Sequence, residues 1–321
     1  MANSDQILSL IKSHVDGDDA RFRMVVMQMA AMESRQGHVV IAKALHDVMN
    51  AGKIHQLRPL RGTSGDAEEL LTRVEATAKM ADLAVDDTIS EALKRVVYEY
   101  EQRDKLRRYN LDNRHKLLLA GPSGTGKTMS ASVLAKELGL SLYVVRLERV
   151  ITKFMGETGL KLSKIFDYMA EVPGVYLFDE FDAIGSQRGM ENEVGEQRRI
   201  LNAFLQMMER PMYDSIIVAA TNAMEAIDKA LFRRFDDVLL YSLPTEKEIV
   251  KLIYDTTGKR DFVVTRTLIS AMNHLSHADI CAVCLEALKN ELLYQEKVDE
   301  KSLIRIAKEH GVTKNYKQSL G

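Results

Sequence analysis

The sequence is poor in several features whose scarcity limits what the protein can be. It contains no tryptophan, five prolines and two cysteines, and its 44 basic and 46 acidic side chains leave a net charge of −2. Proteins that bind nucleic acids or anionic membranes in general usually carry a basic excess, so both classes are disfavoured. No signal peptide opens the chain, and no apolar run approaches the roughly 18–20 residues of a membrane span. These absences predict a cytoplasmic protein without a membrane partner.

The two cysteines, Cys281 and Cys284, lie three positions apart in a helical pattern. This spacing occurs in redox and zinc sites, but no second cysteine pair accompanies it. We therefore expect two small buried residues on one face of a helix.

The first third of the chain has a helical pattern. Residues 1–57 show two segments of helical periodicity, which predict a hairpin whose methionine-rich first helix serves either as a docking face or as the core of the hairpin. The segment "RPLRGTSGD" at 58–66 interrupts the periodicity, as linkers do. A further helix is expected around 67–81, and a charged amphipathic helix over 86–108.

From Lys116 onward, short apolar runs alternate with helical stretches. The runs are "KLLLAG", "LSLYVVRL", "GVYLFDE", "SIIVAATN" and "DDVLLYSLP". Buried parallel strands have this pattern, which predicts an α/β fold with a doubly wound parallel sheet. After Pro244 the strands end, and helical patterns at about 246–256, 265–274, 277–295 and 299–310 predict a small all-α domain.

The strongest local motif is "LLLAGPSGTGKTMSAS", in which an apolar strand runs into a glycine-rich loop and then directly into a helix. The pattern G-x-x-x-x-G-K-[ST] predicts a phosphate-binding loop (P-loop), because its glycines let backbone N–H groups surround a phosphate chain at a helix N-terminus. Lys127 is expected to reach the β- and γ-phosphates, and Thr128 to bind Mg²⁺. The predicted nucleotide-binding residues of the loop are Gly121, Pro122, Ser123, Gly124, Thr125, Gly126, Lys127, Thr128 and Met129.

An acidic pair follows another predicted strand, in "VYLFDEFDAIG". The strand places Asp179 and Glu180 at the carboxyl edge of the sheet, where α/β proteins bind their ligands. We expect Asp179 to hold Mg²⁺ through water and Glu180 to orient and polarise the attacking water, since phosphoryl transfer needs mainly positioning and charge stabilisation. The alternative is a pair that merely caps the strand, and the preceding P-loop disfavours it.

From about Asp86 to Lys308 these motifs resemble the AAA+ ATPases, and within them the AAA clade of protein-remodelling enzymes. "AATN" resembles the sensor-1 segment, which implies that Asn222 helps to hold the attacking water. "LSHADICAVCLEAL" resembles the lid segment beside the adenine, where His277 replaces the usual glycine and precedes Ala278. The resemblance implies ATP and Mg²⁺ as ligands and hydrolysis of ATP to ADP and phosphate.

The segment "IDKALFRRFDDVLLYSLP" resembles the second region of homology of that family. Its Arg233 and Arg234 occupy the positions of arginine fingers, which in this family reach the nucleotide of the adjacent subunit. An arginine that contacts the γ-phosphate raises kcat by roughly 10³–10⁵. The resemblance thus implies a homo-oligomeric ring, usually of six subunits, built by head-to-tail contacts. The alternative is that both arginines are surface charges that pair with Asp236 and Asp237.

The stretch "KFMGET" follows the second predicted strand, where the remodelling members of the family have a pore loop. The resemblance implies that Phe154 and Met155, beside Lys153, grip an unfolded polypeptide in a central pore. An aromatic ring and a flexible thioether suit contacts with varied side chains, and Gly156 lets the loop move. The alternative is a hydrophobic plug over the edge of the sheet.

The sequence thus favours an ATP-driven unfoldase, translocase or disassemblase. One alternative is a nucleotide-dependent oligomeric scaffold or switch that controls a separate effector, and another, disfavoured by the charge, is a DNA-associated loader. Any coupled peptidase would be a separate chain, because no H-E-x-x-H motif is present. The predicted organisation is a helical N-terminal hairpin that docks a partner or substrate (1–57), a linker and helix (58–85), an α/β nucleotide-binding domain (86–244), an α-helical lid domain (245–312) and a polar tail (313–321).

Overall fold

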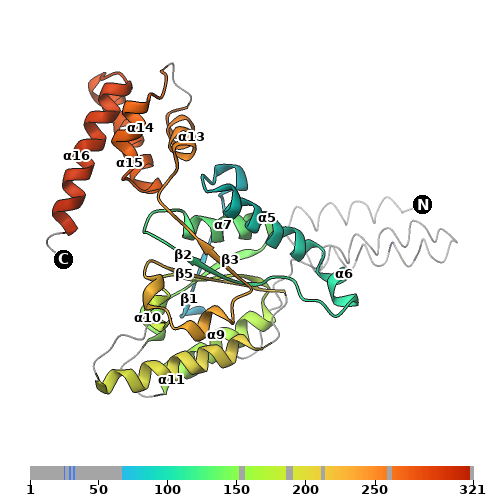
Figure 1. Ribbon diagram of the computed structural model, residues 1–321. Helices are drawn as coiled ribbons and strands as arrows, with labels where there is room; N and C mark the ends of the chain where they lie inside the picture. Colours follow the sequence, from blue (N-terminus) through green and yellow to red (C-terminus); the bar gives the residue numbers. More distant parts are fainter. Residues whose placement is uncertain are drawn as a thin grey trace. The chain divides into compact units, whose positions relative to one another are not determined.

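A computed structural model describes residues 67–151, 156–185, 191–210, 214–258 and 262–318, together with Val25, Met29 and Met32. The chain divides into two units, Met1–Arg61 and Gly62–Gly321. The predicted hairpin of residues 1–57 and the linker at 58–66 lie outside the described residues, apart from those three. The second unit contains every strand and helix discussed below (Figure 1).

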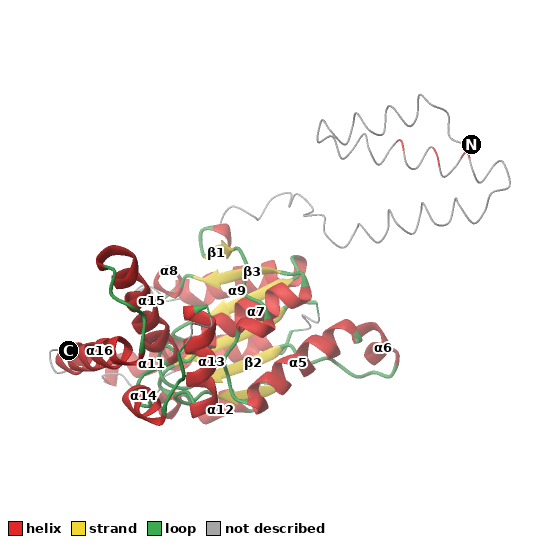
Figure 2. Cartoon of the chain, turned by 90° about the horizontal axis from the view of Figure 1, so that it is seen from above, coloured by secondary structure: helices red, strands yellow, loops and turns green. Residues whose placement is uncertain are grey.

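The described residues of the second unit form a sheet in the order β1-β3-β4-β5-β2-β6 (Figure 2). The strands β2 to β6 are parallel, and all five were predicted from their apolar runs. Every residue of β4 and β5 is buried, because helices cover both faces of the sheet. Their bounds are β2 (Lys116–Ala120), β3 (Ser141–Val145), β4 (Gly174–Phe178), β5 (Ile216–Thr221) and β6 (Asp237–Leu240).

The prediction of a helix around 67–81 is wrong. Residues Leu71–Val74 instead form β1, which pairs antiparallel with β3 at the edge of the sheet, and a short 3₁₀ helix, η2 (Met80–Asp82), follows. The edge of β3 offers unpaired backbone groups, and pairing with them outweighs a weak local preference for helix. The sheet therefore takes up a strand that precedes the predicted start of the α/β domain at residue 86.

Successive residues of β2 face opposite sides of the sheet, as the pleat of a strand requires. Leu117 and Leu119 join the core under α5 (Asp87–Glu101) and α7 (Lys127–Leu138). Leu118 joins the core on the other face, under α9 (Glu157–Glu171) and α11 (Glu191–Met208), where rings such as Phe166 and Phe204 pack edge to face. Figure 1 shows the two helix layers on either side of the sheet. Short helices lie in the connections: α8 (Leu147–Val150), α10 (Asp182–Gly185), η3 (Met224–Ala226) and α12 (Lys229–Phe232).

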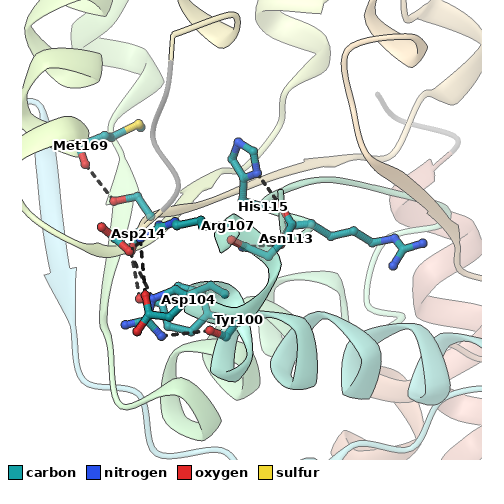
Figure 3. Close-up of polar contacts among 10 residues, drawn as sticks. Tyr100, Asp104, Arg107, Asn113, His115, Met169 and Asp214 are labelled. Atoms are coloured by element: carbon teal, nitrogen blue, oxygen red, sulfur yellow. Dashed lines mark hydrogen bonds and ion pairs between the residues drawn. The ribbon is translucent and has the colours of Figure 1, made fainter. Parts of the chain in front are cut away.

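The predicted helix over 86–108 is divided at Gln102 into α5 and α6 (Arg103–Arg108). A polar cluster fastens this break to the turn before β5 (Figure 3). Tyr100 donates its hydroxyl hydrogen bond to the carbonyl oxygen of Asp214 at 3.0 Å, and Arg103 and Arg107 bind the Asp214 carboxylate at 3.2 and 2.9 Å. The cluster lies at the amino edge of β5, the opposite end of that strand from the predicted phosphate site.

The predicted all-α domain is confirmed, with helices α13 (Glu246–Thr257), α14 (Arg266–Met272), α15 (His277–Tyr294) and α16 (Glu300–Gln318). They share one apolar core, and we call them the lid. Cys284 is fully buried in that core, and burial raises the pKa of its thiol to about 12, in agreement with the expected packing role. Cys281, which was also expected to be buried, is only partly buried and packs against the same core. Among the described residues, no three or more histidine, cysteine, aspartate or glutamate side chains gather where they could hold a metal ion together.

In the part of the chain that the structure describes, no single helix is long and apolar enough to cross a membrane. Among the described helices, one pair, α14 and α15, is long and apolar enough when the two are taken together, and these helices are bent by 119° relative to each other.

Candidate active site

The P-loop connects the end of β2 to the start of α7, as the motif predicts. Gly121 has a φ of +150°, and a Cβ on it would lie 2.2 Å from the carbonyl oxygen of Tyr241. No side chain therefore fits at the first position of the loop. Because the loop ends at Gly126, immediately before Lys127 opens α7, its backbone N–H groups and the helix N-terminus favour an anion.

The side chain of Lys127 is buried at the centre of the site. Its ammonium group donates hydrogen bonds to the carbonyl oxygens of Gly121 and Pro122, at 2.8 and 2.7 Å, and to Oδ1 of Asn222 at 2.8 Å. Burial lowers the pKa of this amine, and the carboxylate of Asp179 opposes that shift. A phosphate oxygen is a stronger partner for a cation than a neutral carbonyl, so Lys127 is suited to hold a phosphate chain.

Thr128 and Asp179 bring two oxygen ligands together. The Thr128 hydroxyl donates a hydrogen bond to Oδ2 of Asp179 at 2.9 Å. Thr128 is the second residue of α7, and Asp179 directly follows β4, so both are positioned by regular elements. A hydroxyl and a carboxylate at the carboxyl edge of the sheet suit Mg²⁺, which prefers oxygen ligands and keeps several waters.

Glu180 has an uncommon backbone conformation for a residue with a side chain, with a φ of +52°. Its N–H donates a hydrogen bond to Oδ1 of Asp179 at 2.9 Å. The residue is exposed, so water can reach its carboxylate. Asn222 directly follows β5, the neighbour of both β4 and β2, and is therefore at the same edge of the sheet as Glu180 and the P-loop.

The lid contacts the P-loop through the first turn of α15. The Ala278 N–H donates a hydrogen bond to the carbonyl oxygen of Gly124 at 3.0 Å. Ser276 caps the helix in a capping box with Asp279. His277 is buried, with Nε2 3.9 Å from Oε2 of Glu248. Burial lowers the pKa of the His277 imidazole, against the opposing effects of that carboxylate and of the Ala84 backbone.

Gly124→Ala is expected to weaken nucleotide binding by about tenfold, which corresponds to about 1.4 kcal/mol. Gly124 has a φ of +75°, and a Cβ there would lie 2.5 Å from Oγ of Ser276 and 3.2 Å from Cβ of Ala278. The added methyl group therefore forces the P-loop and the lid apart. Titration with a fluorescent ADP analogue measures the effect.

Gly258→Ala is the matched control, because Gly258 has nearly the same φ, +74°, but open space around a Cβ. It is expected to destabilise the fold by about 1–2 kcal/mol and to leave nucleotide affinity unchanged. Equal affinity losses in the two variants would mean that backbone strain, and not the contact with the lid, sets the effect at Gly124.

Arg233 and Arg234 lie together on the surface, after α12. With Leu205 and Lys229 they line a hollow of about 480 Å³. Arg234 forms an ion pair with Glu209 at 2.7 Å, and no ion pair of Arg233 occurs among the described residues.

The alternative pairing of the two arginines with Asp236 and Asp237 is not found in the described part of the chain. Asp236 accepts hydrogen bonds from the backbone N–H groups of His115 and Lys116. Asp237 lies 3.9 Å from Arg114. Both carboxylates therefore stabilise the start of β2 and β6, and neither occupies the two arginines, of which Arg234 is paired with Glu209.

The structure brings together most of the predicted site residues. Thr125 is buried and donates its hydroxyl hydrogen bond to the carbonyl oxygen of Pro122 at 2.8 Å, which holds the turn of the P-loop. Pro122 and Ser123 are exposed in the loop, and Thr128 and Met129 are exposed in the first turn of α7. Lys153, Phe154 and Met155 lie outside the described residues. Gly156, which follows them, has a φ of +87° and no atom within 4 Å of a Cβ.

Two sets of residues were missed by the sequence analysis. The capping box "SHAD" signals the helix start that contacts the P-loop, and it was visible in the sequence. Lys229 lines the same hollow as the arginines, and only the fold places it there.

Comparison with known proteins gives consistent results. The model of the "ATPase family associated with various cellular activities (AAA)" matches residues 117–243. The uncharacterized AAA family ATPase y4kL of Sinorhizobium fredii is 31% identical over 306 residues, 92% of each chain. A putative 26S proteasome regulatory subunit homolog of Methanothermobacter thermautotrophicus is 30% identical over 212 residues, which cover 62% of this chain and 56% of that protein. The crystal structure of the FIGL-1 AAA domain in complex with ADP has a TM-score of 0.60 at 20% identity, covers 78% of this chain and 92% of its own, and agrees in fold.

Proposed function

Because this chain belongs to the AAA family of ATPases, we propose that it is a protein-remodelling motor that works as a homo-oligomeric ring, in which subunits complete one another's ATP sites and thread a polypeptide through a central pore. The observation that carries the proposal is the placement of Arg233 and Arg234. Both are exposed at a surface hollow, and among the described residues neither interacts with the P-loop or with Asp179. In a head-to-tail ring, each subunit would present this hollow to the nucleotide bound by its neighbour.

The residues at the sheet edge fit ATP and Mg²⁺. Lys127 supplies a buried cation for the phosphates, and Thr128 and Asp179 supply adjacent oxygen ligands for the metal. Mg²⁺, when bound, neutralises charge on the β- and γ-phosphates. Glu180 is placed to orient the attacking water and to accept its proton, while Asn222 holds that water. Support for nucleotide binding also comes from the FIGL-1 AAA domain, which was crystallised with ADP.

The proposed polypeptide substrate is supported by the family and by the sequence of the loop before α9. Relatives include a putative 26S proteasome regulatory subunit homolog. Phe154 and Met155 directly precede Gly156, which has a φ of +87°, favoured by glycine, and open space around a Cβ. A scaffold that only switches a bound effector would not need a loop that grips unfolded chains.

Phe154→Ala is expected to retain the basal ATPase rate and to lose stimulation by an unfolded polypeptide. Fluorescein-labelled casein serves as the probe, with ATPase rate and casein binding measured together. Leu160→Ala is the matched control, since Leu160 is an apolar residue close by in the sequence, on α9, and 68% of its surface is accessible. If casein stimulates Phe154→Ala as strongly as the unsubstituted protein, the threading function is contradicted and the scaffold alternative gains support.

A further inference from the structure

Glu180, the catalytic base proposed above, has a backbone conformation that its neighbours must maintain. Glu180 has a φ of +52°, a sparsely populated region for a residue with a side chain. Such conformations persist only where surrounding contacts hold them, and they gather at functional sites. The residues on either side of Glu180 are therefore the place to look for such contacts.

Two hydrogen bonds join the turn after β4 to the end of β5. The N–H of Phe181 donates to the carbonyl oxygen of Ala220 at 2.8 Å. The hydroxyl of Thr221 donates to Oδ1 of Asp182 at 2.9 Å. The turn that carries Glu180 is thus fixed to the neighbouring strand directly after that residue.

The same threonine hydroxyl also fixes the segment that carries Asn222. Oγ1 of Thr221 accepts a hydrogen bond from the N–H of Ala223 at 3.1 Å. This hydrogen bond joins the two residues on either side of Asn222 and so closes a tight turn around it. Its own Oδ1 accepts a hydrogen bond from the ammonium group of Lys127 at 2.8 Å.

We infer that Thr221 and Asp182 are positioning residues of the ATPase site, which hold Glu180 and Asn222 in one fixed relation to Lys127. The Thr221 hydroxyl is the common element, because it donates to one segment and accepts from the other. The inference rests on the roles proposed for Glu180 and Asn222, and it adds the contact that keeps these two residues in a fixed position relative to each other.

The burial of Thr221 makes this hydroxyl costly to remove. Only 1% of the residue is exposed, so water does not replace a lost partner there. Without the hydroxyl, the Ala223 N–H loses its acceptor and the Asp182 carboxylate loses its donor. We expect the two segments to shift relative to each other while the strands beneath them stay paired.

Cap formation at α10 is the alternative role for Asp182, which is the first residue of that short helix. The structure favours the bond to Thr221 instead. The first backbone hydrogen bonds at α10 run from Ala183 to the Glu180 carbonyl and from Ile184 to the Phe181 carbonyl, so these N–H groups do not depend on the Asp182 carboxylate.

Thr221→Val tests the inference, because valine keeps the shape and removes the hydroxyl. The expected result is a kcat lower by about 10- to 100-fold, since small misplacements of catalytic groups have effects of this size. The KM for ATP and the affinity for a fluorescent ADP analogue stay within about twofold, because the P-loop is untouched. Thr221→Ser, which restores a hydroxyl, is expected to recover most of the lost kcat.

Ser215→Ala is the matched control at the opposite end of the same strand. Ser215 is also 1% exposed, and its hydroxyl donates to the carbonyl oxygen of Met169 at 2.8 Å, at the end of β5 away from Thr221. Its loss is expected to lower the melting temperature without changing kcat. A purely structural role for Thr221 would give the same result in both variants and would overturn the inference.

Asp182→Ala provides a second, independent test if Thr221→Val does not fold. It is expected to reproduce the loss of kcat, and the double variant is expected to lose no more than either single variant, because both act through one bond. Losses that multiply in the double variant would contradict a shared bond.

Glu180→Gln and Asn222→Ala, assayed alongside, separate two kinds of failure. If both of these lower kcat and Thr221→Val does not, the positioning role is wrong and the proposed site stands. If neither lowers kcat, the proposed site itself is wrong.

Discussion

Arg233→Ala is expected to lower kcat for ATP by about 10³–10⁵-fold, the size of effect that arginine fingers have on phosphoryl transfer. Nucleotide affinity is expected to change little, because Arg233 has no interaction with the P-loop of its own chain among the described residues. Arg234 already forms an ion pair with Glu209, which makes Arg233 the more available of the two guanidinium groups. Steady-state ATPase assays and titration with a fluorescent ADP analogue measure both quantities.

Mixing two inactive variants shows whether Arg233 acts on its own site or on a neighbour's. In a ring that contains Arg233→Ala and Glu180→Gln subunits, an intact site forms where a Glu180→Gln subunit donates its arginine to an Arg233→Ala subunit. In a random equimolar mixture of head-to-tail subunits, about a quarter of all sites are intact in this way. Activity that appears only on mixing therefore supports a composite site.

Arg305→Ala is the control for the loss of an exposed positive charge. Arg305 lies on α16 in the lid and forms ion pairs with Glu296 and Glu309. Exposed pairs of this kind contribute little to stability, so its ATPase rate is expected to match that of the unsubstituted protein. An Arg233→Ala protein that turns over ATP normally would remove the argument for a composite site.

Glu180→Gln is expected to lower kcat by about 10²–10⁴-fold, because the amide has the shape of the carboxylate but cannot accept a proton from water. ATP binding is expected to persist, since the residues proposed to contact the phosphates are Lys127 and the P-loop, which this substitution leaves unchanged. A variant that binds ATP and hydrolyses it slowly accumulates the ATP-bound form. Light scattering with ATP and Mg²⁺ should then give a mass of about six chains, and a smaller mass without them.

Glu171→Gln makes the same chemical change at an exposed position at the end of α9, and no change in rate or mass is expected. A mass of one or two chains for Glu180→Gln in the presence of ATP would contradict the ring. Normal turnover in this variant would instead remove Glu180 from the mechanism. The two measurements therefore test separate parts of the proposed function.

The five parallel strands and the P-loop could be predicted because each depends on a local signal. Buried strands need continuous apolar runs, and phosphate binding needs glycines at fixed positions. Strand β1 could not be predicted this way, since "LTRV" becomes a strand only through pairing with β3. Its conformation is set by a partner strand about 70 positions further along the chain, and the local periodicity of the sequence cannot indicate that partner.

In the site, too, the features set by local sequence could be predicted and those set by tertiary packing could not. Lys127, Asp179 and Asn222 follow strand ends in the sequence, so their convergence follows from parallel strands sharing one carboxyl edge. The bond between Thr221 and Asp182 depends on the rotation of two side chains and could not be derived from spacing. The burial of His277 against Glu248 likewise results from the packing of α13 and α15. Its predicted place beside the adenine stays a prediction.

The contact between Ala278 and Gly124 has a thermodynamic consequence. One hydrogen bond makes the position of the lid and the shape of the P-loop parts of the same equilibrium. By linkage, any factor by which a bound nucleotide shifts the lid is also the factor by which a shift of the lid changes nucleotide affinity. A load applied to the lid, whatever its source, would therefore act as an effector of this enzyme without occupying its active site.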